Sequence, residues 1–225
     1  MYMIKNNKKI VGVILIASLY KSISSKPLKP YTGDIIHNPY ILRNMSSLQQ
    51  FVFPFTKDTV NEWRFFSDQV MGGISEGKVS LNKDGDKFFV KIEGDVRTDN
   101  NGGFIQLRTS TSLFNKSLMF KLLHNSENRG KKLKGIRLNV KGNEDIYHIF
   151  IQTTIFYWLP TMYKIATFKT SSSWETVEIP FNEFENITDK KNTTVRAKDI
   201  KTLGIVAYGR DFKSDLSVSS LEFYY

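Results

Sequence analysis

The chain of 225 residues contains no cysteine and only three histidines. Without cysteine there are no disulfide bonds, thiolate nucleophiles, zinc–thiolate sites or iron–sulfur ligands. His37, His124 and His148 are scattered along the chain, and none lies at metal-ligand spacing from another histidine or from a carboxylate pair. We therefore expect neither a metal site nor a cofactor.

The usual signatures of catalysis are missing as well. There is no Gly-x-Ser-x-Gly nucleophile elbow, and no phosphate-binding glycine loop opens a helix. Asp84, Asp86, Asp95 and Asp99 are crowded together, but they lack the ligand order of an EF-hand, and turn chemistry accounts for the first two. The sequence predicts no catalytic residues and a protein that is not an enzyme.

Long hydrophobic runs are also missing, because the apolar stretch from Ile10 to Tyr20 is shorter than the roughly 20 residues of a transmembrane helix. Lysines precede it, a small and polar stretch follows, and no acidic residue occurs before Asp34. This order is typical of a bacterial signal peptide or, uncleaved, of a weak membrane anchor. We expect residues 1–25 to be such a leader of an exported or membrane-tethered protein on the periplasmic side; a mitochondrial presequence is the alternative.

The formal net charge of +10 is unevenly spread, since Lys5, Lys8, Lys9 and Lys21 lie in the leader. A second basic cluster, 129–134, is expected in a loop. Either it is a solvated loop, or it meets phosphates or an anionic membrane surface. No stacking aromatics are interleaved with it, so we expect no nucleic acid partner.

Residues 26–50 are rich in proline, serine and asparagine without periodicity, which predicts a flexible tether. From residue 51 to 225 the chain gives short strand candidates separated by turn residues, with 17 Phe and 10 Tyr and almost no helical periodicity. This pattern predicts one all-β domain built as a two-sheet sandwich. Strands are expected at 78–81, 88–92, 103–109, 117–123, 136–141, 146–152, 163–170, 174–179, 203–208 and 217–224.

Two hairpins are expected from the turn residues. Asp84-Gly85 separates the first two predicted strands. Gly142-Asn143 separates a strand with Ile136, Leu138 and Val140 on one face from a strand with Tyr147, Ile149 and Ile151 on one face.

The most informative segments are 63–75, WRFFSDQVMGGIS, and 100–108, NNGGFIQLR. Each contains a double glycine, where the backbone is expected to need positive φ or a close approach. A third segment, 174–184, reads WETVEIPFNEF. In order and spacing these three motifs resemble the complex I intermediate-associated protein 30 family.

The resemblance implies a galactose-binding-like jelly-roll sandwich and a role in assembling respiratory NADH dehydrogenase. The expected mechanism is the holding of an immature membrane subunit or subcomplex, without chemistry. One alternative is a carbohydrate-binding module-like domain of an exported protein, because such sandwiches often bind sugars. Another is an accessory domain of an enzyme, since some relatives are fused to a dinucleotide-binding domain.

The motif residues have two possible roles. A bidentate Asp68–Arg108 ion pair would lock the 63–75 segment onto the strand that carries Phe104, as scaffolding. Alternatively, these polar residues converge as a patch for a partner. The candidate partner-binding residues are Asp68, Met71, Gly72, Gly73, Asn100, Asn101, Gly102, Gly103 and Arg108.

Aromatic residues complete the candidates. The stretch 154–163 is unusually apolar, and with Tyr147 it offers a possible aromatic patch for a protein, a sugar or a membrane surface. The members of this patch are Tyr147, Trp158 and Tyr163. Burial of the stretch as a plug is the alternative. Core or turn positions are expected for Trp63, Trp174, Pro180 and Phe181.

Overall fold

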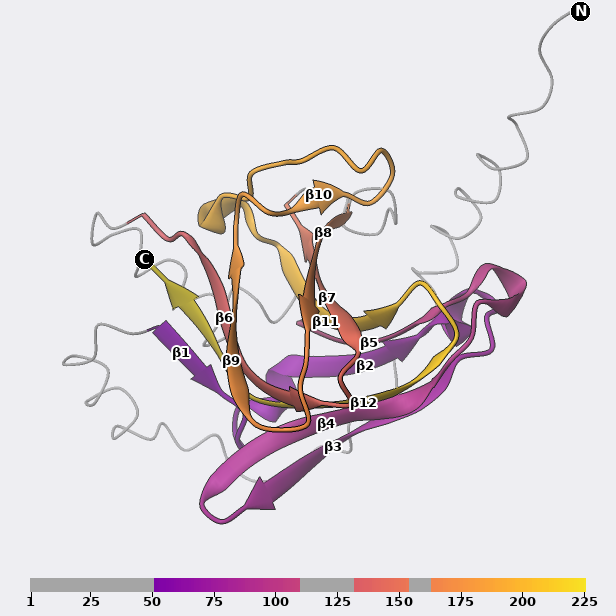
Figure 1. Cartoon of the computed structure of the whole chain (residues 1–225), viewed down its shortest axis with the longest axis horizontal. Helices are drawn as coiled ribbons and strands as arrows, with labels where there is room; N and C mark the ends of the chain where they lie inside the picture. Colours follow the sequence, from indigo (N-terminus) through magenta and orange to yellow (C-terminus); the bar gives the residue numbers. More distant parts are fainter. Residues whose placement is uncertain (1–50, 110–131, 154–162) are drawn as a thin grey trace, which may run out of the picture.

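The computed structural model describes residues 51–109, 132–153 and 163–225, which form two antiparallel six-stranded sheets packed face to face (Figure 1). Sheet A has the order β3-β4-β12-β6-β9, with β1 paired to β12, and sheet B has the order β10-β8-β7-β11-β5-β2. The predicted all-β, two-sheet jelly-roll sandwich is therefore confirmed. The predicted leader 1–25, tether 26–50 and strand 117–123 lie outside the described residues.

The strands of sheet A are β1 (Phe51–Pro54), β3 (Glu76–Asp84), β4 (Lys87–Val96), β6 (Gly135–Gly142), β9 (Glu175–Pro180) and β12 (Phe212–Tyr224). Those of sheet B are β2 (Trp63–Ser67), β5 (Phe104–Thr109), β7 (Ile146–Gln152), β8 (Tyr163–Lys169), β10 (Glu185–Asn186) and β11 (Thr202–Tyr208). Short 3-10 turns lie between them: η1 (Val60–Glu62), η2 (Asp68–Met71), η3 (Asp99–Asn101) and η5 (Ala197–Asp199).

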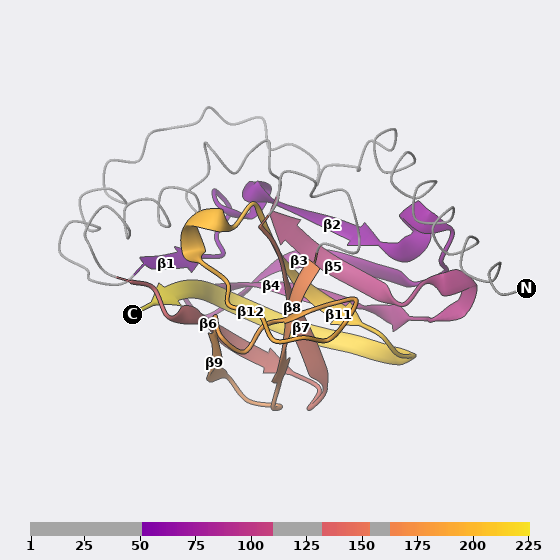
Figure 2. The same cartoon turned by 90° about the horizontal axis from the view of Figure 1, so that it is seen from above.

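Strand β12 organises sheet A. Its first half pairs with β4 and its last residues with β1 along the same edge, while β6 pairs along the other edge. Figure 2 shows β1 beside the C-terminal end of β12. The long strand thus holds three neighbours and brings the chain terminus into the sheet.

Alternation along each strand builds the core. Ile136, Leu138 and Val140 of β6 are fully buried, as are Tyr147, Ile149 and Ile151 of β7. The first set was expected to face a core and the second to share one face of its strand, and both belong to one core cluster between the sheets. Trp63 and Phe181 are also in this core, as predicted.

The hairpin at Asp84-Gly85 is confirmed, since β3 and β4 pair on either side of it. The hairpin expected at Gly142-Asn143 is wrong. Strand β6 pairs with β12 and β9 in sheet A, whereas β7 pairs with β11 and β8 in sheet B. Two strands that each have one apolar face can pair within one sheet, or they can face each other from opposite sheets across the core. Both arrangements give the same alternation of apolar and polar residues, so the pattern alone cannot distinguish them.

Candidate functional site

The carboxylate of Asp68 joins two of the motifs. Asp68 is fully buried at the start of η2 and accepts hydrogen bonds from Ser75 N (2.9 Å) and Ser75 Oγ (2.5 Å). It also accepts hydrogen bonds from Gly103 N (2.5 Å) and Phe104 N (3.2 Å) at the start of β5. The side chain therefore clamps the loop after β2 to the loop before β5. We call this arrangement the Asp68 clamp.

The two double glycines serve this clamp in the same way. Gly72 has φ +90° and Gly103 has φ +115°, a backbone conformation that side chains rarely adopt. A Cβ on Gly73 or on Gly102 would lie 2.4 Å from an oxygen of the Asp68 carboxylate. In each pair, one glycine supplies positive φ and the other allows a close approach, so both expectations from the sequence are confirmed.

The expected Asp68–Arg108 ion pair is wrong. Arg108 donates instead to Tyr163 Oη at 2.8 Å, and its guanidinium lies 4.4 Å from the centre of the Phe66 ring. The carboxylate binds the amide of Phe104, and Arg108 lies four residues further along β5, about 13 Å away. The two side chains therefore make separate contacts, Asp68 in η2 and Arg108 on sheet B.

The clamp also positions an exposed tip. Ile74 is 45% exposed, Met71 is half-buried, and Asn100 and Asn101 are exposed with φ of 56° and 58°. These residues come from the two clamped loops, so the structure does bring the motif loops together. We call Met71, Ile74, Asn100 and Asn101 the motif tip.

The predicted aromatic patch does not form among the described residues. Tyr147 is fully buried in the core between the sheets, whereas Tyr163 belongs to a separate cluster with Phe150 on the outer face of sheet B. In the β7–β8 pair Tyr147 lies opposite Phe168, five residues from Tyr163, and an odd separation places side chains on opposite faces. Trp158 lies outside the described residues.

The outer face of sheet B also holds His148, which was expected on a half-exposed strand face. Its ring contacts the rings of Phe150 and Tyr208 at centroid distances of 6.2 and 5.5 Å. Burial, aided by the positive charge of Lys190, lowers the pKa of His148 to about 4. The imidazole is therefore neutral at pH 7.

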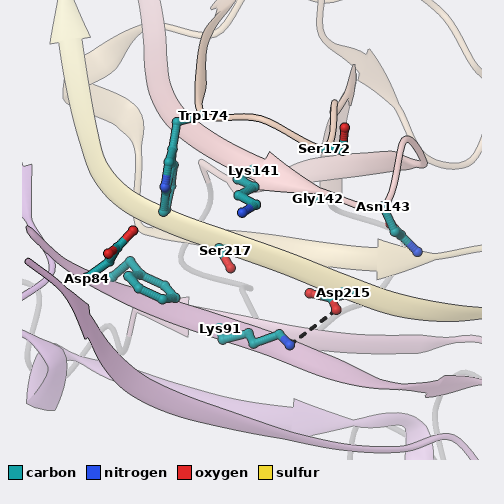
Figure 3. Close-up of a pocket in the computed structure, with 10 residues that line it drawn as sticks. Asp84, Lys91, Lys141, Gly142, Asn143, Ser172, Trp174, Asp215 and Ser217 are labelled. Carbon is teal, nitrogen blue, oxygen red and sulfur yellow. Dashed lines mark ion pairs between the residues drawn. The ribbon is translucent and has the colours of Figure 1, made fainter.

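A groove of about 380 Å³ lies on the outer face of sheet A (Figure 3). Trp174 and Asp84 stand at one end in this view, and Asn143 and Ser172 at the other. The strands β3, β4, β6 and β12 contribute to it together with the turn before β9. Its lining residues are Asp84, Phe89, Lys91, Lys141, Gly142, Asn143, Ser172, Trp174, Asp215 and Ser217.

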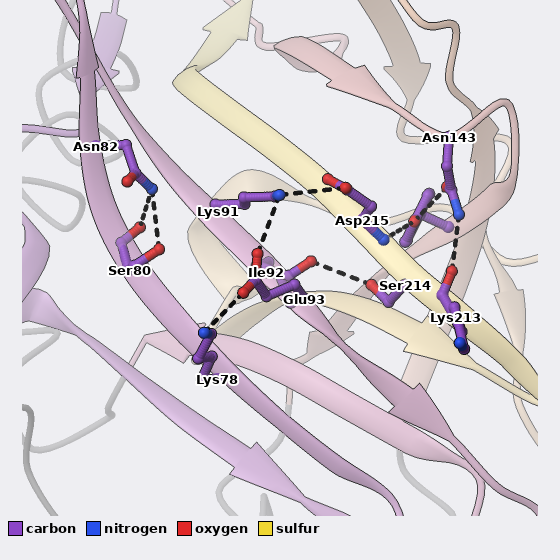
Figure 4. A network of polar contacts seen from close by, with 11 residues as sticks. Lys78, Ser80, Asn82, Lys91, Ile92, Glu93, Asn143, Lys213, Ser214 and Asp215 are labelled. Carbon is purple, nitrogen blue, oxygen red and sulfur yellow. Dashed lines mark hydrogen bonds and ion pairs between the residues drawn. The ribbon is translucent and has the colours of Figure 1, made fainter.

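The floor of this groove is held by polar contacts (Figure 4). Lys91 Nζ lies 3.2 Å from Asp215 Oδ2 and 3.0 Å from Glu93 Oε2. The hydrogen bond to Glu93 and the nearby Asp215 raise the pKa of Lys91 despite its partial burial. Asn143 donates to the carbonyl of Lys213 at 2.7 Å, which fixes its amide.

Tyr147 supports the floor from within the core. Its hydroxyl donates to Asn143 Oδ1 at 2.7 Å and accepts from the backbone N–H of Asp215 at 2.9 Å. Burial raises the pKa of Tyr147, so the hydroxyl keeps its proton. One core side chain thus positions two residues of the groove.

The wall at one end of the groove is aromatic. The Trp174 ring lies 5.4 Å from the Phe89 ring in an edge-to-face contact, and Lys87 Nζ lies 3.8 Å from the Trp174 ring centre. Lys87 also donates to Asn139 Oδ1 at 2.6 Å. Of the core or turn positions expected for it, Trp174 takes the turn before β9 and is half-exposed, because the alternation that directs Val177 and Ile179 toward the core turns Trp174 outward.

The sequence could have predicted this outward position, because the even-numbered residues of β9 face solvent and 174 is even-numbered. Pro180 ends β9, as a turn position was expected to do.

Within the described residues, no group of three or more His, Cys, Asp or Glu side chains is placed to hold a metal ion. The absence of a metal or cofactor stays a prediction.

No helix in the described part of the chain has the length and apolar character needed to cross a membrane.

The fold defines the class as a jelly-roll β-sandwich, and the comparisons with known proteins agree. A family 11 carbohydrate-binding module of a cellulosomal cellulase from Clostridium thermocellum is 14% identical, with a TM-score of 0.50 over 72% of this chain and 87% of that one. The module from Clostridium thermocellum in complex with a β-1,3-1,4-mixed-linked tetrasaccharide is 13% identical, with a TM-score of 0.51 over 77% and 95%. At these identities the likeness shows the fold.

Residues 53–218 match the family Complex I intermediate-associated protein 30, so the chain belongs to this family. The match includes all three motifs that suggested the resemblance. No curated protein sequence matches the chain.

Proposed function

We propose that this protein is a non-enzymatic binding domain that assists the assembly of a membrane respiratory complex, NADH dehydrogenase, by holding an immature subunit. The observation that carries the proposal is the family match, which spans the sandwich and its motifs. The geometry of the Asp68 clamp supports a role without chemistry. This buried carboxylate accepts four hydrogen bonds, from Ser75, Gly103 and Phe104, so it holds two loops together.

We place the contact with the subunit at the motif tip. Ile74 is as exposed as any large apolar residue among those described, and it follows a loop that is held rigid by the clamp. A rigid loop loses little conformational entropy on binding, so an exposed apolar side chain there contributes more to affinity than one on a mobile loop. Asn100 and Asn101 supply a polar rim beside it.

The test is a pull-down of the tagged full-length protein from gently solubilised native membranes, with bound proteins identified by mass spectrometry. Ile74→Ser is the test variant, and Ile146→Ser is the matched control because both residues are 45% exposed. We expect NADH dehydrogenase subunits with the wild type and the control, and a large loss with Ile74→Ser. Recovery of no respiratory subunit by the wild type would overturn the assembly role.

The leader extends this proposal. With a basic start and a short apolar run, residues 1–25 would send the domain to the periplasmic side of a bacterial membrane, or alternatively to a mitochondrion. Cell fractionation followed by sequencing of the mature N-terminus tests this. Recovery in the cytosolic fraction with an intact, untethered N-terminus contradicts it.

A second candidate function is binding of carbohydrate by an exported domain. One observation favours it: the groove on sheet A combines an indole wall with carboxylate, ammonium, amide and hydroxyl groups. Two solved neighbours with the same fold are carbohydrate-binding modules by name. A saccharide binding assay on the purified full-length chain tests this function: binding supports it, and no binding contradicts it.

A further inference from the structure

We infer that the groove beside Trp174 is a binding site for a neutral oligosaccharide, and this inference rests on the second candidate function. The residues expected to contact the sugar are Asp84, Lys141, Trp174 and Ser217. This assigns the ligand to the outer face of sheet A, at a place other than the two double-glycine segments.

The first argument is the size and composition of the groove. Its volume of about 380 Å³ lies in the range of roughly 300–1,000 Å³ typical of small-molecule sites, which combine aromatic walls with a few polar groups. The hydroxyl-bearing rings of a sugar have apolar C–H faces and polar edges. An indole beside carboxylate, ammonium and hydroxyl groups matches both parts.

The second argument is the charge. Two lysines and two aspartates line the groove, and the Lys91–Asp215 ion pair neutralises one of each. A groove with balanced charges has no net field to concentrate an anionic polymer, in contrast to the basic stripes that bind nucleic acids. A neutral ligand fits this balance.

The third argument concerns the groups that remain available. Within the described ranges, the side chains of Asp84, Lys141 and Ser217 make no hydrogen bond or ion pair, although they line the same groove. Asp84 accepts hydrogen bonds, Lys141 donates them, and Ser217 does both, so together they can bind the hydroxyl groups of a sugar. The paired floor of Lys91, Asp215 and Asn143 stays rigid beneath them.

The fourth argument is preorganisation of the wall. Phe89 packs on the indole of Trp174 and Lys87 covers part of it, so the ring is held upright before any ligand arrives. A ring fixed in this way loses little freedom when it stacks on a sugar. The indole surface that lines the groove is therefore ready for stacking.

The experiment is isothermal titration of the full chain with four ligands: cellotetraose, laminaritetraose and maltotetraose as neutral oligosaccharides, and heparin as an anionic one. Trp174→Ala is compared with Tyr224→Ala, a half-exposed aromatic residue of sheet A outside the groove. Asp84→Asn is compared with Asp86→Asn, a residue of the same turn that does not line the groove. Thermal unfolding of each variant checks the fold.

We expect at least one neutral oligosaccharide to bind, with Kd raised about tenfold or more by Trp174→Ala, equal to about 1.4 kcal/mol. Asp84→Asn should raise Kd several-fold, and both controls should leave it unchanged. If a neutral sugar binds all variants equally, the groove is not the site, although the carbohydrate function stands. Binding of heparin alone overturns the neutral ligand, and binding of none overturns both the site and the second candidate function, leaving the assembly role to its own pull-down.

Discussion

Replacing Asp68 with alanine tests how much of the fold depends on the clamp. The substitution leaves the buried amides of Ser75 and Gly103 and the partly buried amide of Phe104 without their acceptor. Each buried unpaired donor costs about 1–3 kcal/mol. Ser75 Oγ keeps its contact with the backbone of Arg97, and water entering the space left by the carboxylate restores part of the loss. We therefore expect a loss of about 4 kcal/mol.

Urea unfolding of the purified domain measures this loss directly. At this chain length 1 kcal/mol corresponds to a change of roughly 2–4 °C in Tm, so Asp68→Ala should lower Tm by about 8–16 °C. Asp68→Asn keeps one acceptor oxygen and should lose about half as much. The matched control is Asp99→Ala, which removes an exposed ion pair with Arg97 and should cost less than about 1 kcal/mol. A loss below 1 kcal/mol for Asp68→Ala would refute the clamp as a source of stability.

Three further predictions concern His148, Gly102 and Tyr147. The pKa of His148 is about 4 in the folded chain, against an ordinary value of 6.5 in the unfolded chain. Between these two pH values only the unfolded chain binds the proton, so the free energy of unfolding should fall by about 2 kcal/mol from pH 7 to pH 5. Urea titrations of His148→Phe should lack this part of the decline; an unchanged decline contradicts the buried neutral imidazole. Gly102→Ala places a methyl group against Asp68 and should cost about 3 kcal/mol, against about 1 kcal/mol for Gly85→Ala in an open turn, by thermal unfolding; equal losses contradict the close approach. Tyr147→Phe removes one hydroxyl beneath the groove and should raise the Kd of any bound sugar about fivefold while the chain stays folded.

The sequence was sufficient for the sandwich because alternation and turn residues are local signals. It identified β5, β6, β7, β8, β9 and β11 closely and parts of β3, β4 and β12, and it found the β3–β4 hairpin from Asp84-Gly85. It did not identify β1, β2 or the two-residue strand β10 as strands. These segments pair with distant parts of the chain, so their extended structure depends on contacts that local pattern does not contain.

The site was harder to predict, and the reason differs from residue to residue. Asp68 was selected as a motif residue, but its partners are three backbone amides and the Ser75 hydroxyl, which the sequence pattern did not reveal. Tyr147 was correctly placed on the same face as Ile149 and Ile151, and that face is the buried one. Trp174 was expected at a core or turn position without a choice between them, although the alternation of the strand that follows it indicated the solvent face.

The clamp and the end of the groove formed by Asp84 and Trp174 lie at opposite ends of the same strand. Ser75 directly precedes β3 and Asp84 ends it, about 30 Å away along the strand. Sites this far apart with no shared residue affect binding independently. Ile74→Ser should therefore weaken capture of a protein subunit without changing the affinity for sugar. Trp174→Ala should weaken sugar binding without changing capture of the subunit. The family motif would then serve assembly at one end of β3 while the groove serves a second ligand at the other. A variant of either kind that impairs both activities in a folded protein would show that the two surfaces are coupled.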